Sequence, residues 1–159
     1  MNKYRIEIKW AFIFAGMTLL WMLLERLVGL HDKHINKHEM LTNLIAIPAI
    51  AIYILALMDK RKNYYENAMT YKQGFISGLV ISIIVAILSP ITQIITSKVI
   101  TPDYFHNAIN YTVVDGKYTR AEAEQFFNLN NYIIYGMIGA LVMGVVTTAI
   151  FAFFVRNRK

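Results

Sequence analysis

The sequence predicts an all-α, polytopic membrane protein, a four-transmembrane-helix bundle with a short amphipathic helix in the last extracytoplasmic loop. Composition is the first observation, because 57% of the residues are hydrophobic and 16% are charged, against roughly 45–50% and about 25% in soluble domains. Charge-free segments are the second, because three of them are about as long as the roughly 20-residue helix that crosses a bilayer. The length of 159 residues suits a single transmembrane domain, 1–159.

Three membrane spans follow from uninterrupted runs of uncharged residues. These runs cover 40–58, 73–97 and 125–155, and each is bounded by charged side chains. They predict transmembrane helices at about 41–58, 74–97 and 132–155.

The first span is less clearly marked, since only residues 10–24 lack charge. At about 1.5 Å per residue this segment is too short to cross the hydrocarbon layer. A helix over about 10–30 is long enough, but it brings Glu25 and Arg26 to the edge of the membrane. A signal peptide is the competing interpretation, because MNKYRIEIK resembles a charged leader. No small-residue cleavage site follows the apolar stretch, so we expect an uncleaved span.

Lysine and arginine residues predict how the bundle is oriented. Ten of them lie in the N-terminus, the loop between the second and third spans, and the C-terminal tail, whereas six lie on the other side. We therefore expect both termini in the cytoplasm, where anionic headgroups attract the basic flanks. The expected partners are the lipid bilayer and a second copy of the chain or another membrane protein. Nucleic acid is not expected, because the basic clusters are short flanks of apolar helices.

Small residues recur at every fourth position of the last two spans, and such positions form one narrow ridge on a helix. Helices in lipid associate through close van der Waals contact, which small residues permit. We expect the two ridges to pack against each other, with self-association of two copies as the alternative. The ridge residues are Gly74, Gly78, Ser82 and Ala86, followed by Pro90, and Gly136, Ala140, Gly144 and Thr148, followed by Ala152.

The last loop, about 98–131, is long enough to contain structure. Thr119 and Glu122 have the spacing of a capping box, which predicts an amphipathic helix over about 119–127. We expect the phenylalanines at its end to rest on the outer headgroup region, where aromatic side chains collect. An interfacial helix that covers the bundle is the favoured interpretation over a binding site.

Glu25 is the ionisable residue closest to membrane depth, which makes it a functional candidate. It shares the small-residue face of the first span and would lie level with polar residues of the other three. The hypothesis is an outward-facing polar pocket formed by Glu25, Asn43, Gln93, Thr96 and Tyr135. The alternative, which the position near the helix end favours, is that the carboxylate is solvated in the interface beside Arg26.

The outer side also holds all four histidines. His31, His34 and His38 have i, i+3, i+7 spacing, so a helical extension would align their rings. Three imidazoles can hold zinc with an open fourth position or titrate together near pH 6. The alternative is a polar loop that contains histidine without a ligand role. The chain has no cysteine, which removes disulfides, cysteine-based zinc sites and thiol nucleophiles.

Enzymatic motifs are missing from the sequence, including a nucleophile elbow, a phosphate loop, a dinucleotide fingerprint and HExxH. We expect a protein that is not an enzyme and takes no cofactor. The favoured function is an accessory, interaction or structural membrane module. One alternative is a transporter or channel subunit that uses the pocket around Glu25. The other is a metal- or pH-sensing module that uses the outer histidines.

Several short motifs carry a family resemblance over nearly the whole chain. They are MTYKQGFISG at the entry to the third span, SPITQ in its outer half, and TPDYF followed by EAE in the last loop. Together with a glycine- and threonine-rich last span and a basic tail, they make the chain resemble the membrane family of domain of unknown function 4199, which is common in Bacteroidota. The resemblance implies a small four-span protein of the bacterial inner membrane. It supplies no activity, so no functional residue carries over.

Overall fold

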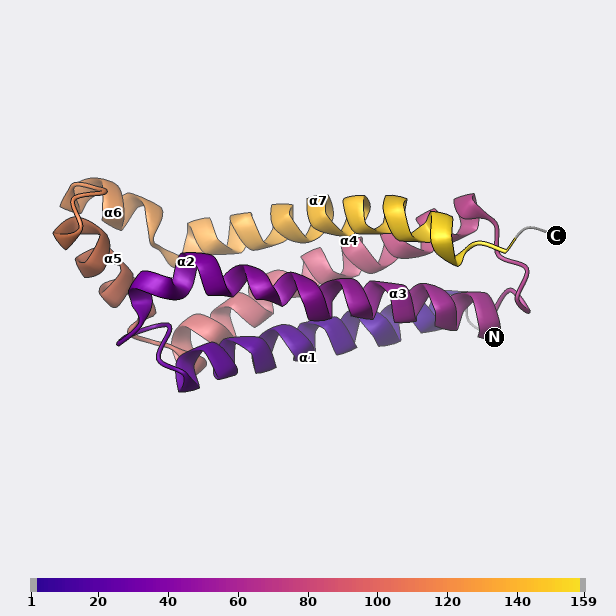
Figure 1. Cartoon of the computed structure of the whole chain (residues 1–159), viewed down its shortest axis with the longest axis horizontal. Helices are drawn as coiled ribbons and strands as arrows, with labels where there is room; N and C mark the ends of the chain where they lie inside the picture. The colour runs from indigo at the N-terminus through magenta and orange to yellow at the C-terminus, as the bar shows by residue number, and fades with distance from the viewer. Residues whose placement is uncertain (1–2, 158–159) are drawn as a thin grey trace.

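The computed structural model describes residues 3–157 and contains helices and turns, with no strand in that range. Arg158 and Lys159, which the orientation argument counts in the basic tail, lie outside the described residues. Four long helices lie side by side (Figure 1) and form the body of the molecule: α1 (Arg5–Leu27), α3 (Ala46–Asn63), α4 (Tyr71–Ile95) and α7 (Leu129–Val155). The prediction of an all-α membrane bundle is confirmed.

Each long helix is long and apolar enough to cross a membrane, so the chain is a multi-pass membrane protein. Short helical segments lengthen two of the four spans. The second runs over Ile35–Asn63 through η1 (Ile35–Lys37), α2 (His38–Leu41) and η2 (Thr42–Ile45), and the third runs over Tyr71–Ile100 because α4 continues as η3 (Thr96–Ile100).

The first span extends further toward the N-terminus than its apolar run. Helix α1 begins at Arg5 rather than near residue 10, because charged residues of its first turns are paired with α3. Lys60 contacts Glu7 at 2.9 Å, and Lys9 forms an ion pair with Asp59. These ion pairs let α1 extend beyond the N-terminal end of its apolar run.

Both chain termini lie at one end of the bundle, here called the terminal end, and two further helices cover the opposite loop end (Figure 1). Helix α6 (Arg120–Phe126) falls inside the predicted 119–127 segment, and Thr119 and Glu122 form its capping box. Its Phe126 stacks on Tyr118 with ring centroids 6.0 Å apart. Helix α5 (Tyr104–Val114) was not predicted by the sequence pattern.

Helices α4 and α7 form the most extensive contact between two elements, and the two small-residue ridges lie in it. A Cβ added at Gly78 would come within 2.2 Å of Thr148, and one added at Gly144 within 2.1 Å of the Ser82 Oγ. A Cβ at Gly136 would lie 2.6 Å from Ser89. The glycines therefore permit this crossing because any larger residue would push the helices apart.

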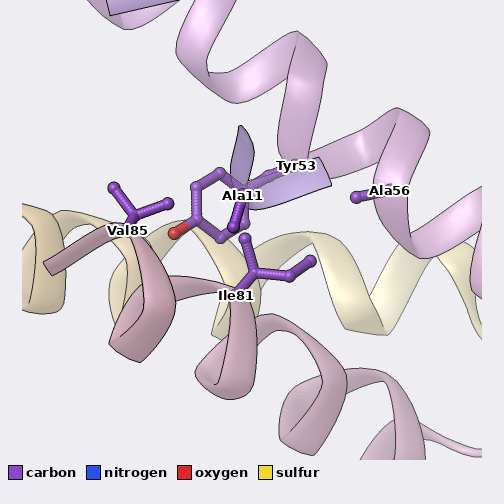
Figure 2. Close-up of a cluster of buried hydrophobic side chains, with 5 residues drawn as sticks. All are labelled: Ala11, Tyr53, Ala56, Ile81 and Val85. Atoms are coloured by element: carbon purple, nitrogen blue, oxygen red, sulfur yellow. The ribbon is translucent and has the colours of Figure 1, made fainter. Parts of the chain in front are cut away.

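The remaining core joins α1 and α3 to α4. Figure 2 shows Tyr53 of α3 against Ile81 and Val85 of α4, with Ala11 of α1 and Ala56 of α3 packed around them. The Tyr53 hydroxyl donates to Ser82 Oγ at 2.8 Å, while Ser82 donates to the Gly78 carbonyl. The Tyr53–Ser82 contact thus links α3 to the α4 ridge.

Candidate metal centre

Glu25 lies in the last turn of α1, and its side chain is only 2% exposed. The chain turns back on itself directly after it, because Gly29 adopts a positive φ of +80° that favours glycine. The Leu30 amide donates to the Glu25 carbonyl at 2.9 Å, and the His34 amide donates to the Gly29 carbonyl at 2.7 Å. This turn brings the side chain of His31 to the Glu25 carboxylate.

Two imidazole rings face one carboxylate oxygen. The Oε2 of Glu25 lies 3.0 Å from Nε2 of His31 and 3.4 Å from Nε2 of His38. The other oxygen, Oε1, accepts a hydrogen bond of 2.5 Å from the indole nitrogen of Trp21, one turn earlier on α1. Three segments therefore supply the site: the end of α1, the turn that follows it, and the start of α2.

Helix α5 closes the site from outside. The Tyr104 ring packs against both imidazoles, with centroids 5.1 Å from His31 and 5.2 Å from His38. Its hydroxyl lies 3.5 Å from Nδ1 of His38 and 3.2 Å from the hydroxyl of Tyr132. Burial raises the pKa of Tyr104 well above its usual range. The phenol therefore stays neutral and can donate or accept a hydrogen bond at any physiological pH.

A second contact ties α5 to the same turn, because Asn107 donates to the His31 carbonyl at 3.0 Å. The His31 side chain is 5% exposed, and its Nδ1 is enclosed without a hydrogen-bond partner among residues 3–157. A buried polar atom without a partner costs free energy and calls for a structural or functional reason.

The donor set of this cluster matches that of zinc proteins. One ligand atom each from Glu25, His31 and His38 can be chosen so that all three lie within 4.8 Å of one another. Zinc binds histidine nitrogen and carboxylate oxygen at about 2.0–2.2 Å, and sites with three protein ligands leave a fourth position for water. Small side-chain rotations would bring all three ligand atoms around one ion.

The residues proposed from the sequence do not form one site. Glu25, His31 and His38 come together, whereas His34 is exposed and outside the cluster, because the turn at Gly29 replaces the helical extension. Of the remaining pocket residues, Asn43 and Gln93 line a separate cavity, Thr96 is buried in η3, and Tyr135 is 49% exposed.

Sequence reasoning missed Trp21 and Tyr104 as parts of this site. Trp21 precedes Glu25 by four residues, so its helical spacing is a signal that was available in the sequence. Tyr104 lies 79 residues after Glu25 in the sequence. It contacts the histidines only because the last loop folds over them.

A family model described as a protein of unknown function (DUF4199) matches residues 9–157. Neither the curated proteins nor the solved structures include a match to the chain.

Proposed function

We propose that this chain, which belongs to the DUF4199 family of proteins of unknown function, is a metal-responsive accessory module of the bacterial inner membrane. The observation that carries the proposal is the convergence of Glu25, His31 and His38 under the ring of Tyr104. The ligand class is a divalent transition metal such as zinc, since imidazole and carboxylate together favour it over magnesium or calcium. The lysine and arginine distribution supports a location on the outer side of the membrane.

The charge balance at Glu25 supports a cation as the missing partner. A buried carboxylate is stable only when it is paired or well hydrogen-bonded. The adjacent Arg26 points away and donates to the Ile100 carbonyl, so it does not pair with Glu25. The carboxylate accepts hydrogen bonds from Trp21 and Thr42 and faces two imidazoles, and none of these groups carries a fixed positive charge. A bound divalent ion would supply that charge.

Metal binding would act on the loop end as a whole. The three ligands connect α1 to α2, and the contacts of Tyr104 and Asn107 connect α5 to the same place. A ligand that binds only the folded state stabilises it by about 2.7 kcal/mol when its concentration is 100 times Kd. The metal would thereby order the outer surface that a membrane partner contacts.

Zinc titration of the purified protein in detergent tests the proposal. We expect zinc to raise the Tm of the wild-type protein, and magnesium to leave it unchanged. Glu25→Gln and His38→Gln should each abolish the zinc response, because each removes one of three ligands. The matched control is His34→Gln, which changes an exposed histidine of the same turn and should respond as the wild type does.

Equal loss of the response in His34→Gln would contradict the site, as would a wild-type protein that ignores zinc. Lowering the pH should weaken zinc binding, because protons compete for the ligand atoms.

Transport is the second candidate function, and the observation that favours it is a cavity of about 460 Å³ lined by all four spans. Because Glu25 lies outside this cavity, Gly139→Leu on the cavity wall is the variant that tests transport through it, and it should lower uptake in proteoliposomes. An accessory module would show no uptake with either the wild-type protein or the variant.

A further inference from the structure

The cavity in the outer half of the bundle is separate from the metal cluster and has its own chemistry. Its volume is about 460 Å³, within the roughly 300–1,000 Å³ of small-molecule sites. Every one of the four spans contributes to its wall, for example Thr18 of α1, Tyr53 of α3, Gln93 of α4 and Gly139 of α7. Glu25, His31 and His38 do not line it.

The lining changes character along the bundle axis. Toward the middle of the bundle the wall is mainly apolar, with Phe14, Val85 and Met143 beside the side chains of Tyr53 and Thr147. Toward the loop end it carries the amides of Asn43 and Gln93 and nearby hydroxyls. Asn43 is exposed at this polar end, and Met143 is exposed beside the apolar part of the wall. Such a wall fits a molecule with a polar head and an apolar tail.

The polar end offers hydrogen-bond acceptors without any charge. The Asn43 side chain donates its amide to the Glu39 carbonyl at 2.7 Å, and that of Gln93 donates to Ser97 at 3.0 Å. Their side-chain carbonyl oxygens have no partner among the described residues and can accept from a ligand. None of the described lining residues is ionisable near neutral pH, so a phosphate or carboxylate head would lose its hydration without a counter-charge.

Gly139 lies on the α7 wall of the cavity, where the space beside it is unfilled. A Cβ added there meets nothing within 4 Å among residues 3–157, whereas Cβ atoms at Gly136 and Gly144 would collide with their neighbours. Glycine inside a helix costs about 0.5–1 kcal/mol relative to alanine. At Gly136 and Gly144 the close helix contact explains that cost, whereas a larger side chain at Gly139 would extend into open space on the cavity wall.

We infer that the cavity binds a neutral single-chain amphiphile with a hydroxyl-bearing head group, of the monoacylglycerol class. The hydroxyls donate to the free amide oxygens of Asn43 and Gln93, and the acyl chain lies along the apolar wall toward Val85. This inference uses no ligand of the metal centre, so either one can fail without the other.

Native mass spectrometry of the purified protein with 1-monooleoylglycerol tests this site. We expect one bound molecule per wild-type chain, and weaker retention of oleic acid, which has the same chain length and an ionised head. Gly139→Leu should lower monooleoylglycerol affinity by about tenfold, which corresponds to roughly 1.4 kcal/mol, because its side chain fills the cavity. Gly16→Leu is the matched control, since Gly16 also has open space around its Cβ but lies outside the cavity lining.

A second variant keeps the test decisive if Gly139→Leu does not fold. Gln93→Leu removes an acceptor while leaving the apolar wall intact, and it should also weaken monooleoylglycerol binding. Unchanged affinity in the folded variants would overturn the inference. Equal binding of oleic acid and monooleoylglycerol would overturn it as well, because the uncharged polar end would then play no part.

Discussion

At the level of single residues, the two ends of the bundle each bury a carboxylate, and they balance its charge differently. Glu7 at the terminal end contacts the ammonium of Lys60 at 2.9 Å and accepts a hydrogen bond of 2.8 Å from Ser77. Lys60 also lies over the ring of Tyr64, 3.8 Å from its centroid. Glu25 at the loop end has no comparable cation among the described residues. The first carboxylate is paired with a lysine, whereas the second is held by hydrogen-bond donors and faces two imidazoles.

The Glu7–Lys60 pair gives a residue-scale prediction. Both side chains are 2% exposed, so Lys60→Met leaves a buried carboxylate without its partner. Losing one member of a buried pair costs about 3–5 kcal/mol, and the Tm measured in detergent should fall accordingly. Adding Glu7→Gln to the same protein should recover most of the loss. If Lys60→Met alone is as stable as the wild type, the ion pair contributes nothing to stability.

At the level of elements, helix contacts depend on where small residues occur. The α4–α7 contact has glycines facing Thr148 and Ser82, at distances that leave no room for a Cβ. The Ser82 hydroxyl in this contact donates to the Gly78 carbonyl of its own helix, whereas the buried Thr148 hydroxyl has no hydrogen-bond partner among the described residues. Association through small residues and van der Waals contact is the general mode for helices in lipid.

Substitution of these glycines provides the element-scale prediction. Gly78→Leu or Gly144→Leu should destabilise the bundle by at least about 1–3 kcal/mol, the usual cost of overpacking, because the helices must separate. Thermal unfolding in detergent and migration on size exclusion measure the effect. Gly16→Leu places the same side chain into open space on α1 and should have little effect. Equal behaviour of all three variants would mean that the ridges do not hold α4 and α7 together.

At the level of the whole molecule, the four spans give the protein two chemically different ends. The terminal end carries the basic last turn of α3, from which Arg61 donates to the Val155 carbonyl at 2.8 Å. The loop end carries α5 and α6 together with the candidate metal centre. Because the number of spans is even, both termini lie on the same side of the membrane.

Cysteine labelling tests the orientation that the charge distribution predicts. The chain contains no cysteine, so single-cysteine variants have no background. Val114→Cys, at a position 88% exposed on the loop end, should react with an impermeant thiol reagent in intact cells. Lys62→Cys, exposed at the terminal end, should react only after the cells are opened. The reverse pattern would place the metal centre on the cytoplasmic side.

The loop end shows where sequence patterns stop being informative. The capping box at Thr119 and Glu122 predicted α6, because that signal lies within four residues. Helix α5 was not predicted, although Tyr104, Phe105, Ala108 and Ile109 recur with the spacing of an amphipathic helix. The three histidines were expected to align on a helix, but the positive φ of Gly29 turns the chain and leaves His34 outside.

The sequence by itself determined the all-α membrane class, the number of spans and the small-residue faces of the last two. Those features depend on hydropathy along the chain and on the periodicity of a helix, which are local properties. Only the tertiary structure decided that Glu25 meets His31 and His38 under Tyr104, and that Glu7 meets Lys60 across 53 positions. It also decided where the four spans leave a cavity. These features depend on how distant segments pack, since side chains from different helices become neighbours only when the bundle has formed.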